Sequence, residues 1–480
     1  MITKPRENLF IQMTSLLFII SGCGVATAQT TAASSLPEAP KIRLPAESQM
    51  DPNPPASRSQ AATSGGATAG EPQSLTRTDA EQMAIKNNPR ISVGRLVALA
   101  QHQVVRETRA AELPTALASV TAEDALQASR ISAGTLTASR LFEHAGAGAS
   151  ASQLITDFGR TRNLVLSSKL QEKAQNASAL ATVEDIVLAT DQAFYNALQA
   201  KALLDVSKQN VETRQTTDNQ ISVMTKNKLK STLDLSFADV NLSQAKLLLL
   251  DAQNNADSTM AALDDVLGLD KKVIFDLEGG TDALQAPPVD EDQLLQLALQ
   301  QRPDLQALDY DHQAAVKFSR AQRDQLLPSI SALGTVGIVP IRPGSQYYVA
   351  NWWGGVGVNM NIPIFNGFLY TSQAKEATIR AQAAAEQTRD LRDHIVRDVR
   401  TSWLSANTAY QRVAVTEELF KQANLALQLA QTRYQMGLSS IVELSQAQFQ
   451  QTDAAIGNTN AQYQYRLALS ALNFEIGATP

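Results

Sequence analysis

The side chains that most often carry enzyme chemistry are scattered through this sequence. The four histidines lack the spacing of a metal site or of a zinc-protease helix; they are His102, His144, His312 and His394. The sequence contains no glycine-rich phosphate loop and no nucleophile elbow, and Gly355-x-Gly357 falls in an expected strand, where close packing explains it. Asp185 and Asp191 are expected on solvated helix faces. We therefore predict neither enzyme activity nor a cofactor or metal site.

The composition indicates long helices rather than a compact enzyme. Ala, Gln, Leu, Ser and Thr dominate the 480 residues, aromatic residues make up 5% and charged residues 18%. Small residues of this kind are typical of interfaces between long helices. The net charge of −6 argues against a nucleic-acid-binding protein with a broad basic face.

The N-terminus has the pattern of a bacterial export signal. Lys4 and Arg6 precede an apolar stretch over residues 9–20. Ala26-Thr27-Ala28 predicts cleavage after residue 28, so that residues 1–28 form the signal peptide. Ile20-Ser21-Gly22-Cys23 predicts instead a signal over 1–22 with Cys23, the only cysteine, carrying a lipid anchor. Both alternatives remain open.

Residues 29–73 are rich in Pro, Ala, Ser and Gly and are predicted to form a disordered tether. Beyond the signal, the sequence has no apolar run of about 18 residues, the length that a transmembrane helix needs. A mature chain that crosses a membrane would therefore do so with strands closed into a barrel.

The sequence contains two copies of one unit. Five landmarks recur in order at offsets of 214, 214, 208, 209 and 209 residues. The pairs are Asn88-Pro89 with Arg302-Pro303, Leu113-Pro114 with Leu327-Pro328, Thr156-Asp157-Phe158-Gly159 with Ile364-Phe365-Asn366-Gly367, Leu233-Asp234-Leu235-Ser236 with Val442-Glu443-Leu444-Ser445, and Ala262-Leu263 with Ala471-Leu472. We place the first repeat at 74–270 and the second at 286–477.

Each repeat is predicted to contain the same elements in the same order. A short helix, with Thr78 or Asp290 as its N-cap, is followed by a second helix over roughly 90–112 or 304–326. Two strands come next, at about 114–127 and 142–156 in the first repeat and about 328–340 and 348–364 in the second. A long helical hairpin over 160–268 or 368–477 completes each repeat.

The long helices carry a coiled-coil seam. Apolar and small residues advance by threes and fours, at Leu180, Val183, Val187, Thr190, Phe194 and Ala197, and again from Leu242 to Leu267. At 1.5 Å per residue, a helix of about 67 residues is roughly 100 Å long. The hairpins are expected to turn near 227–232 and 437–440.

The strands suggest that several chains share one barrel. Residues 356–362 alternate apolar with small or polar side chains, as in a strand with two different faces. Four strands are too few for a barrel, since the smallest bacterial outer-membrane barrels have about eight, and lipid does not tolerate open edges. Three chains would supply twelve strands. The aromatic residues around the last strand fit interfacial girdles or, alternatively, ordinary core packing; they are Tyr347, Tyr348, Trp352, Trp353, Phe365, Phe368 and Tyr370.

Over residues 74–477 the chain resembles the TolC-like outer-membrane efflux proteins. The resemblance rests on the duplication and on four motifs: Arg302-Pro303-Asp304-Leu305, Leu327-Pro328-Ser329-Ile330, Pro363-Ile364-Phe365-Asn366-Gly367, and Tyr434-Gln435-Met436-Gly437 leading to Val442-Glu443-Leu444 and Ala447-Gln448. It implies a mainly α fold with a membrane β-barrel: four strands per chain, a trimeric twelve-stranded barrel, and a long α-helical coiled-coil tunnel in the periplasm.

The resemblance also implies a function and partners. The protein would be the passive outer-membrane duct of a tripartite efflux or type I secretion system, working with a periplasmic adaptor, an inner-membrane pump and outer-membrane lipid. It would have no catalytic site and no obligatory cofactor. A periplasmic coiled-coil adaptor or structural protein is the alternative, although an adaptor would carry one helical hairpin within β-rich domains.

Residues near the hairpin turns are the candidate site. By similarity, Tyr434 and Asp234 form a closing contact at the periplasmic mouth, and Glu443 belongs to an acidic ring that attracts cations. Gln446 stands where the family can carry a second acid, so a double carboxylate ring is not expected here. The alternative is that Asp234 and Glu443 are ordinary solvated acids.

The turns are also the expected adaptor-docking tips. The second tip consists of Gly437, Leu438 and Ser439, with glycine providing the positive φ of a tight turn. The first tip departs from this pattern and consists of Asn227, Lys228, Leu229 and Lys230. Asn227 is expected to adopt the left-handed conformation there. The lysines either select an adaptor or merely solubilise the tip.

Overall fold

The computed structural model describes residues 73–123, 130–133, 136–140, 144–269, 273–279, 284–288, 290–341 and 352–478. These residues lie in one structural unit, Ala67–Pro480. The expected export signal, Cys23 and all but the last residue of the predicted tether lie outside the described residues, as do Tyr347 and Tyr348.

The helices of the described residues occur in four pairs of equal length, one member from each half of the chain. The first-half helices are α1 (Arg77–Asn87, 11 residues), α2 (Pro89–Ala110, 22), α3 (Arg160–Lys226, 67) and α4 (Thr232–Val266, 35). Their counterparts are α5 (Glu291–Gln301, 11), α6 (Pro303–Asp324, 22), α7 (Leu369–Gln435, 67) and α8 (Ile441–Glu475, 35). The duplication therefore extends to the length of every helix.

Helix starts follow local capping chemistry. The N-cap of α1 is Thr76, whose hydroxyl accepts a hydrogen bond from the Asp79 backbone N–H, so the prediction of Thr78 was wrong by two residues. Asp290 caps α5 as predicted, accepting from the backbone N–H groups of Asp292 and Gln293. Where the strands return to α3 and α7, the backbone takes positive φ at two consecutive residues in each repeat; these are Phe158 with Gly159 and Gly367 with Phe368.

The main sheet is antiparallel, with strand order β2-β5-β7-β8. The strands are β2 (Thr115–Glu123), β5 (His144–Thr156), β7 (Ser329–Ile341) and β8 (Trp352–Asn361). Two smaller sheets were not predicted: β3 (Arg130–Ala133) pairs antiparallel with β4 (Leu136–Arg140), and β1 (Gln73–Leu75) pairs parallel with β6 (Phe275–Leu277).

The register gives the main sheet two chemically different faces. One row across all four strands joins Ala116, Ala151, Gly334 and Val356, and the neighbouring rows on that face are apolar or small except at Gln153. The opposite face carries mostly Ser, Thr, Gly and Asn, with a minority of larger side chains. Glu123 is the only Asp, Glu, Lys or Arg in these four strands.

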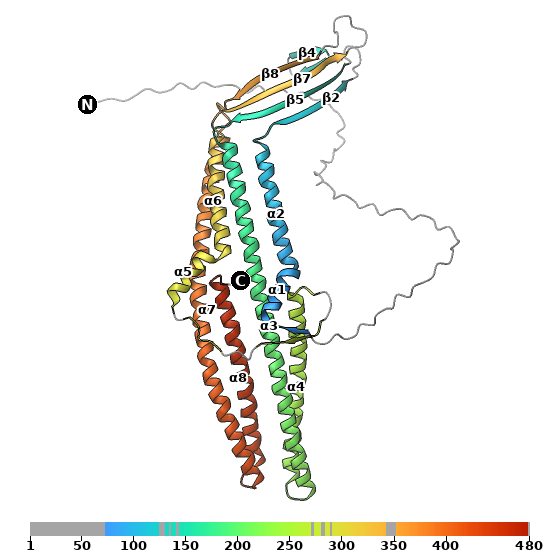
Figure 1. Ribbon diagram of the computed structural model, residues 1–480, viewed down its shortest axis with the longest axis vertical. Helices are drawn as coiled ribbons and strands as arrows, with labels where there is room; N and C mark the ends of the chain where they lie inside the picture. The colour runs from blue at the N-terminus through green and yellow to red at the C-terminus, as the bar shows by residue number, and fades with distance from the viewer. Residues whose placement is uncertain are drawn as a thin grey trace, which may run out of the picture. The chain divides into compact units, whose positions relative to one another are not determined.

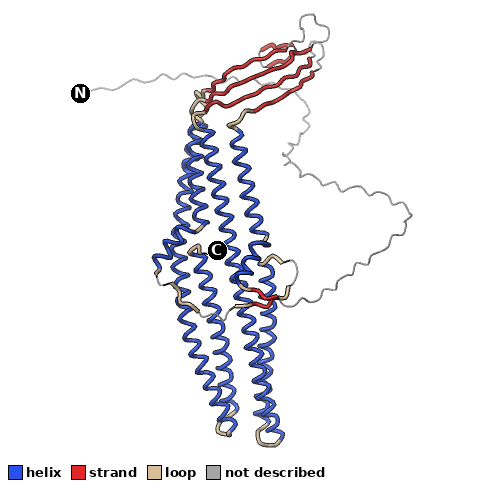
Figure 2. Tube along the Cα trace, in the orientation of Figure 1, coloured by secondary structure: helices blue, strands red, loops and turns tan. Residues whose placement is uncertain are grey.

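Two of the helices run the whole way from this sheet to the hairpin turns. Figures 1 and 2 show the sheet at one end of α2, α3, α6 and α7; α3 and α7 continue to the turns, while α2 and α6 end partway along them, next to α1 and α5. α3 packs against α2, α4, α6 and α8, and α7 packs against α5, α6 and α8. At 1.5 Å per residue, α3 and α7 are each roughly 100 Å long. None of the described helices is long and apolar enough to cross a membrane.

Three buried clusters hold the helices together. The largest joins α1, α3 and α4 to the β1–β6 pair, and it includes Phe194, Leu263 and Leu267 of the predicted seam. A second joins α5, α6, α7 and α8 around Ile395 and Leu472. The predicted seam residues Val187, Thr190 and Ala197 are also buried, whereas Leu180 is 61% exposed. Burial of these residues therefore confirms the predicted seam, except at Leu180, its first position.

Candidate functional site

The two hairpin turns share one backbone geometry. In the first turn the Leu229 N–H donates to the Met224 carbonyl at 2.8 Å, and in the second the Leu438 N–H donates to the Arg433 carbonyl at 2.8 Å. This six-to-one bond is the mark of a Schellman C-cap, which needs a left-handed residue just before the donor. Both long helices therefore end in the same way.

The left-handed residue of the first turn is Lys228, not Asn227. Lys228 has φ 61° and Gly437 has φ 74°, so the two occupy equivalent positions, while Asn227 has φ −86°. The prediction for Asn227 was wrong because the hydrogen-bond pattern, rather than side-chain preference, fixes which residue must turn. A lysine in this conformation carries a steric cost that glycine avoids.

The return helices also begin alike. Ser231 caps α4 and accepts from the Asp234 N–H at 3.2 Å, while the Asp234 carboxylate accepts from the Ser231 N–H at 3.3 Å. This reciprocal pair is a capping box. Ser440 caps α8 by accepting from the Glu443 N–H at 3.3 Å. Asp234 and Glu443 thus occupy the same helical position in the two repeats.

Tyr434 lies where the two hairpins meet. It is 6% exposed and packs in a cluster with Ile221, Ala238, Ile441 and Leu444, which come from α3, α4 and α8. Its hydroxyl is buried and has no hydrogen-bond partner among the described residues. A cavity of about 350 Å³ adjoins the ring.

Two charged groups act on Tyr434. The Lys230 Nζ lies 4.1 Å from the centre of the Tyr434 ring, a cation–π contact between the two repeats that the sequence did not predict. Burial, and secondarily the nearby Asp234 carboxylate, raise the pKa of Tyr434. Asp234 and Tyr434 are therefore neighbours, but no hydrogen bond joins them within the described chain.

The other candidate side chains lie on the surface of the tips. Glu443 is exposed and forms an ion pair with Arg433 of α7 at 3.2 Å. Gln446 is exposed as well. In the turns themselves Asn227, Lys228, Leu229, Gly437 and Leu438 are exposed, and Lys230 and Ser439 are half-buried.

A buried ionic cluster lies along the helices and involves a residue whose environment was predicted wrongly. Asp191 is 4% exposed, not solvated. It accepts from the Arg77 guanidinium of α1 at 3.2 Å and from the Ser470 hydroxyl of α8 at 2.7 Å. Glu81 is also 4% exposed and lies 3.0 Å from the same Arg77 nitrogen. The partners are 114 and 279 residues from Asp191 in sequence, so helix periodicity did not reveal them.

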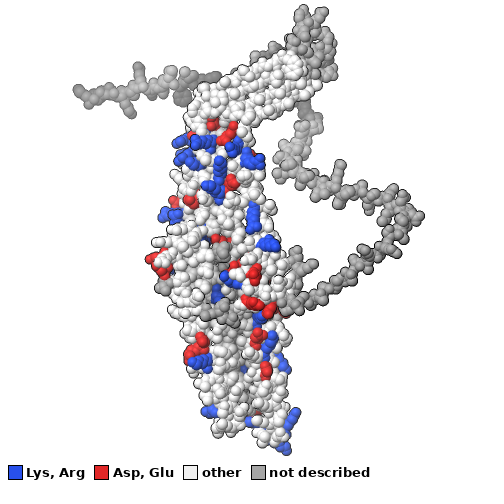
Figure 3. Space-filling view, in the orientation of Figure 1, with Lys and Arg blue, Asp and Glu red and all other residues white. Residues whose placement is uncertain are grey.

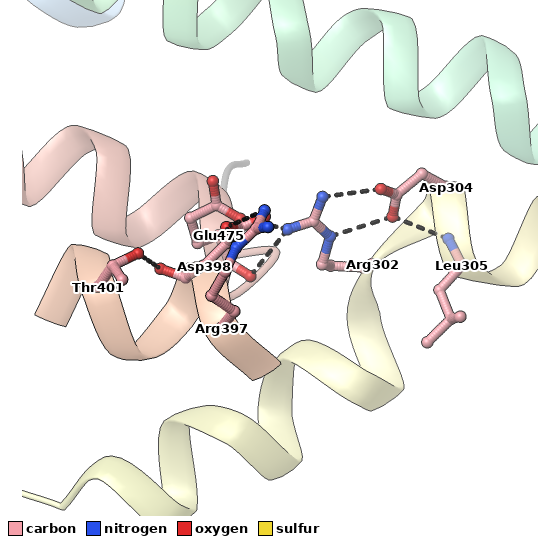
Figure 4. Close-up of polar contacts among 7 residues, drawn as sticks. All are labelled: Arg302, Asp304, Leu305, Arg397, Asp398, Thr401 and Glu475. Carbon is pink, nitrogen blue, oxygen red and sulfur yellow. Dashed lines mark hydrogen bonds and ion pairs between the residues drawn. The ribbon is translucent and has the colours of Figure 1, made fainter. Parts of the chain in front are cut away.

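A second ionic cluster holds the start of the second repeat to its end. Figure 4 shows Arg302 between Asp304 and Glu475. The Arg302 guanidinium donates to both Asp304 oxygens, at 3.1 and 2.7 Å, and also forms an ion pair with Glu475. In the first repeat the equivalent Asn88 amide donates to the Val266 carbonyl at 3.0 Å. The residue before the repeated proline therefore ties the helix start to the end of the hairpin in both repeats.

The carboxylates around Arg302 outnumber it. Burial, with the charge of Asp304 as the next cause, raises the pKa of Glu184 on α3 to about 7. Burial also raises the pKa of Glu475 against the opposing effect of Arg302. The site thus holds several acids around one arginine.

Comparison with known proteins relates this arrangement to a family. Residues 294–478 match the family model described as outer membrane efflux protein. The chain is 24% identical over 329 residues to outer membrane protein TolC of Escherichia coli K12, covering 65% of each chain. It is 23% identical to TolC of Vibrio cholerae, covering 64% of this chain and 71% of that one. The aligned segment is therefore just under two thirds of the E. coli relative.

Solved structures share the fold. Outer membrane protein VceC of Vibrio cholerae matches with a TM-score of 0.71 at 18% identity, over 84% of this chain and 96% of that one. The MtrE outer membrane channel of Neisseria gonorrhoeae matches with a TM-score of 0.69 at 18% identity, over 84% and 88% of the two chains. These matches confirm the predicted TolC-like fold with duplicated helical hairpins. Residues 294–478 thus match the outer membrane efflux protein family in sequence, and 84% of the chain shares the fold of solved outer-membrane channels.

Proposed function

We propose that three copies of this chain form the outer-membrane channel of a tripartite efflux or type I secretion system. The duct is passive: it has no catalytic site and no cofactor, and it spans the outer membrane and the periplasm. Its partners are a periplasmic adaptor and an inner-membrane pump. The observation that carries the proposal is the four-stranded sheet, which is amphipathic and open at both edges.

The open edges support assembly from several copies. β2 and β8 are the edge strands of the sheet, and neither outer edge has a partner strand among the described residues. Each neighbouring pair in the sheet is antiparallel, so β2 and β8 run in opposite directions. The β8 of one copy can therefore pair with the β2 of the next without breaking the antiparallel pattern. Three copies close twelve strands.

The face chemistry supports contact with lipid. On β8, Val356 and Val358 are 95% and 70% exposed on the apolar face, and Asn359 and Asn361 lie on the other. The sheet surface in Figure 3 shows no charged side chain, while charges of both signs lie on the helices directly below. At the other end of the strand, Trp352 lies on the apolar face and is 74% exposed, as an interfacial aromatic residue is, while Trp353 lies on the polar face.

A matched pair of strand variants tests the sheet. Val358→Lys places a charge on the apolar face and Asn359→Lys places one on the polar face, one residue away. A lysine facing lipid costs up to about 2–4 kcal/mol, so Val358→Lys should abolish the trimer in outer-membrane fractions. Asn359→Lys should assemble and alter conductance in planar bilayers. Equal behaviour of the two variants, or a wild type that is a soluble monomer as a periplasmic adaptor would be, contradicts the proposal.

The hairpin tips are the proposed periplasmic gate and docking surface. The buried Tyr434, the adjacent Asp234 and the exposed acid Glu443 support a closing contact and a cation-attracting ring at the mouth, with Gln446 as a neutral member. The exposed tip residues are the proposed adaptor contacts. A channel that carries both Tyr434→Phe and Asp234→Ala should have a higher resting conductance than the wild-type channel. An unchanged resting conductance would remove these two residues from the gate.

A further inference from the structure

Arg214 is a buried arginine without a counter-ion. It lies on α3 and is 7% exposed. No described carboxylate forms an ion pair with it: Asp218, one turn away, interacts with Asp239 and Lys246 of α4, and Asp453 of α8 is exposed. Burial lowers the pKa of Arg214, but a guanidinium remains protonated at neutral pH. An uncompensated charge in such a place costs several kcal/mol.

The polar neighbours of Arg214 are neutral, and their acceptor atoms are occupied. Its Nε donates to the Asn210 Oδ1 at 3.2 Å and its Nη1 to the Gln448 Oε1 at 2.6 Å. Thr452 also donates to the Asn210 Oδ1, at 3.2 Å. The Arg214 Nη2 and the Asn210 Nδ2 have no hydrogen-bond partner among the described residues. The free polar groups on these two side chains are therefore donors.

A cavity adjoins these donors. It has a volume of about 250 Å³ and lies among α3, α7 and α8. Besides Arg214 and Asn210, its polar lining includes the amides of Gln209, Gln451 and Asn458, and none of its lining residues is an Asp or Glu. Since a water molecule occupies about 30 Å³ of liquid, the space holds a small ion together with several waters.

We propose that this cavity is a binding site for a small inorganic anion, chloride in ordinary salt, held by the Arg214 guanidinium and the Asn210 amide. The anion supplies the charge that the protein does not, and the remaining N–H donors are the groups that bind it. Because Arg214 belongs to the first repeat and Gln448 to the second, the anion stabilises the junction between the two hairpins. This inference does not depend on the proposed function.

Bromide is the first probe, because it replaces chloride and can be located by anomalous scattering. Crystals of the full-length protein grown or soaked in bromide should show an anomalous peak within hydrogen-bonding distance of Arg214 and Asn210. A map with no peak in the cavity overturns the proposal, even where exposed arginines carry bromide.

The second probe is thermal unfolding of the full-length protein in detergent at constant ionic strength, with chloride replacing gluconate, a larger organic anion. The melting temperature should rise saturably by about 1–3 °C, with the half-maximal effect below about 100 mM chloride. Arg214→Gln should abolish the rise, and Arg412→Gln, a change at an exposed arginine of α7, should retain it. Equal melting temperatures of the wild type in chloride and gluconate overturn the proposal, so a misfolded Arg214 variant does not decide the outcome.

Discussion

Glu81→Gln should make the first-repeat junction more stable at alkaline pH and leave it almost unchanged in acid. Glu81 and Asp191 are both 4% exposed and share the single guanidinium of Arg77. Burial, followed by a hydrogen bond with Asp191 and the Asp191 charge, raises the pKa of Glu81 from 4.5 to about 7, against the opposing effect of Arg77. Two buried carboxylates thus compete for one cation.

The sign and size of the effect follow from proton linkage. Because the folded-state pKa is the higher one, the folded state holds the proton more tightly than the open state does. The stability that the proton on Glu81 gives the folded junction is fully present below about pH 4.5 and is lost as the pH rises through 7. A shift from 4.5 to about 7 corresponds to about 3–4 kcal/mol at 1.4 kcal/mol per pKa unit. Glutamine mimics the protonated acid at every pH, so it should recover about this amount at pH 8.

Hydrogen exchange of the α1 amides, measured by mass spectrometry, reports the local opening free energy. At pH 8, exchange in Glu81→Gln should be about two orders of magnitude slower than in the wild type; at pH 5 the difference should shrink to a few-fold. Comparing the two proteins at the same pH removes the intrinsic pH dependence of exchange. Glu212→Gln, at an exposed glutamate of α3, is the matched control and should change nothing in α1. Equal exchange of wild type and Glu81→Gln at pH 8, or an effect that does not vary with pH, would refute the reasoning.

Three further variants test other features of the structure. Lys228→Gly should raise the free energy of unfolding of the first tip by about 0.5–1 kcal/mol, because glycine relieves the strain of the left-handed conformation. Slower hydrogen exchange of the Leu229 amide would show this gain, and an unchanged exchange rate would show that Lys228 is not strained. Arg302→Gln should cost about 1–3 kcal/mol by leaving its half-buried acids unpaired. The loss in melting temperature should be smaller at pH 5 than at pH 8, where the acids cannot take up protons, and equal losses at the two pH values would contradict this. Glu443→Gln should reduce cation selectivity in planar bilayers, and unchanged reversal potentials would exclude the acidic ring.

The sequence predicted those parts of the fold that depend on local chemistry. The prolines at 89 and 303, the strand alternation near Val356 and the seam around Phe194 each follow from steric or hydrophobic rules that act over a few residues. Periodicity also implied the long hairpins, since an uninterrupted helix must return to bury its seam.

The parts that the sequence did not predict depend on contacts between distant segments. Asp191 looked like any surface acid until α1 and α8 were placed beside it, and Arg214 gave no sign that its neighbours would be neutral. Asn227 was wrongly given the left-handed conformation, because side-chain preference favoured it while the capping hydrogen bonds required Lys228 to turn. The gate residues stay predictions, since the mouth and the acidic ring would form only when several copies of the chain assemble.

The two hairpin turns have the same backbone shape but different charges. The first carries lysines at 228 and 230, and the second offers only Gly437, Leu438 and serines on an almost identical backbone. In a ring of three chains, six similar ends would alternate between cationic and neutral around the opening. Its electrostatic symmetry would be threefold although its outline is nearly sixfold. A docking protein with six equivalent binding segments would then contact two kinds of hairpin tip, one cationic and one neutral. It could distinguish them by charge although the helices are the same.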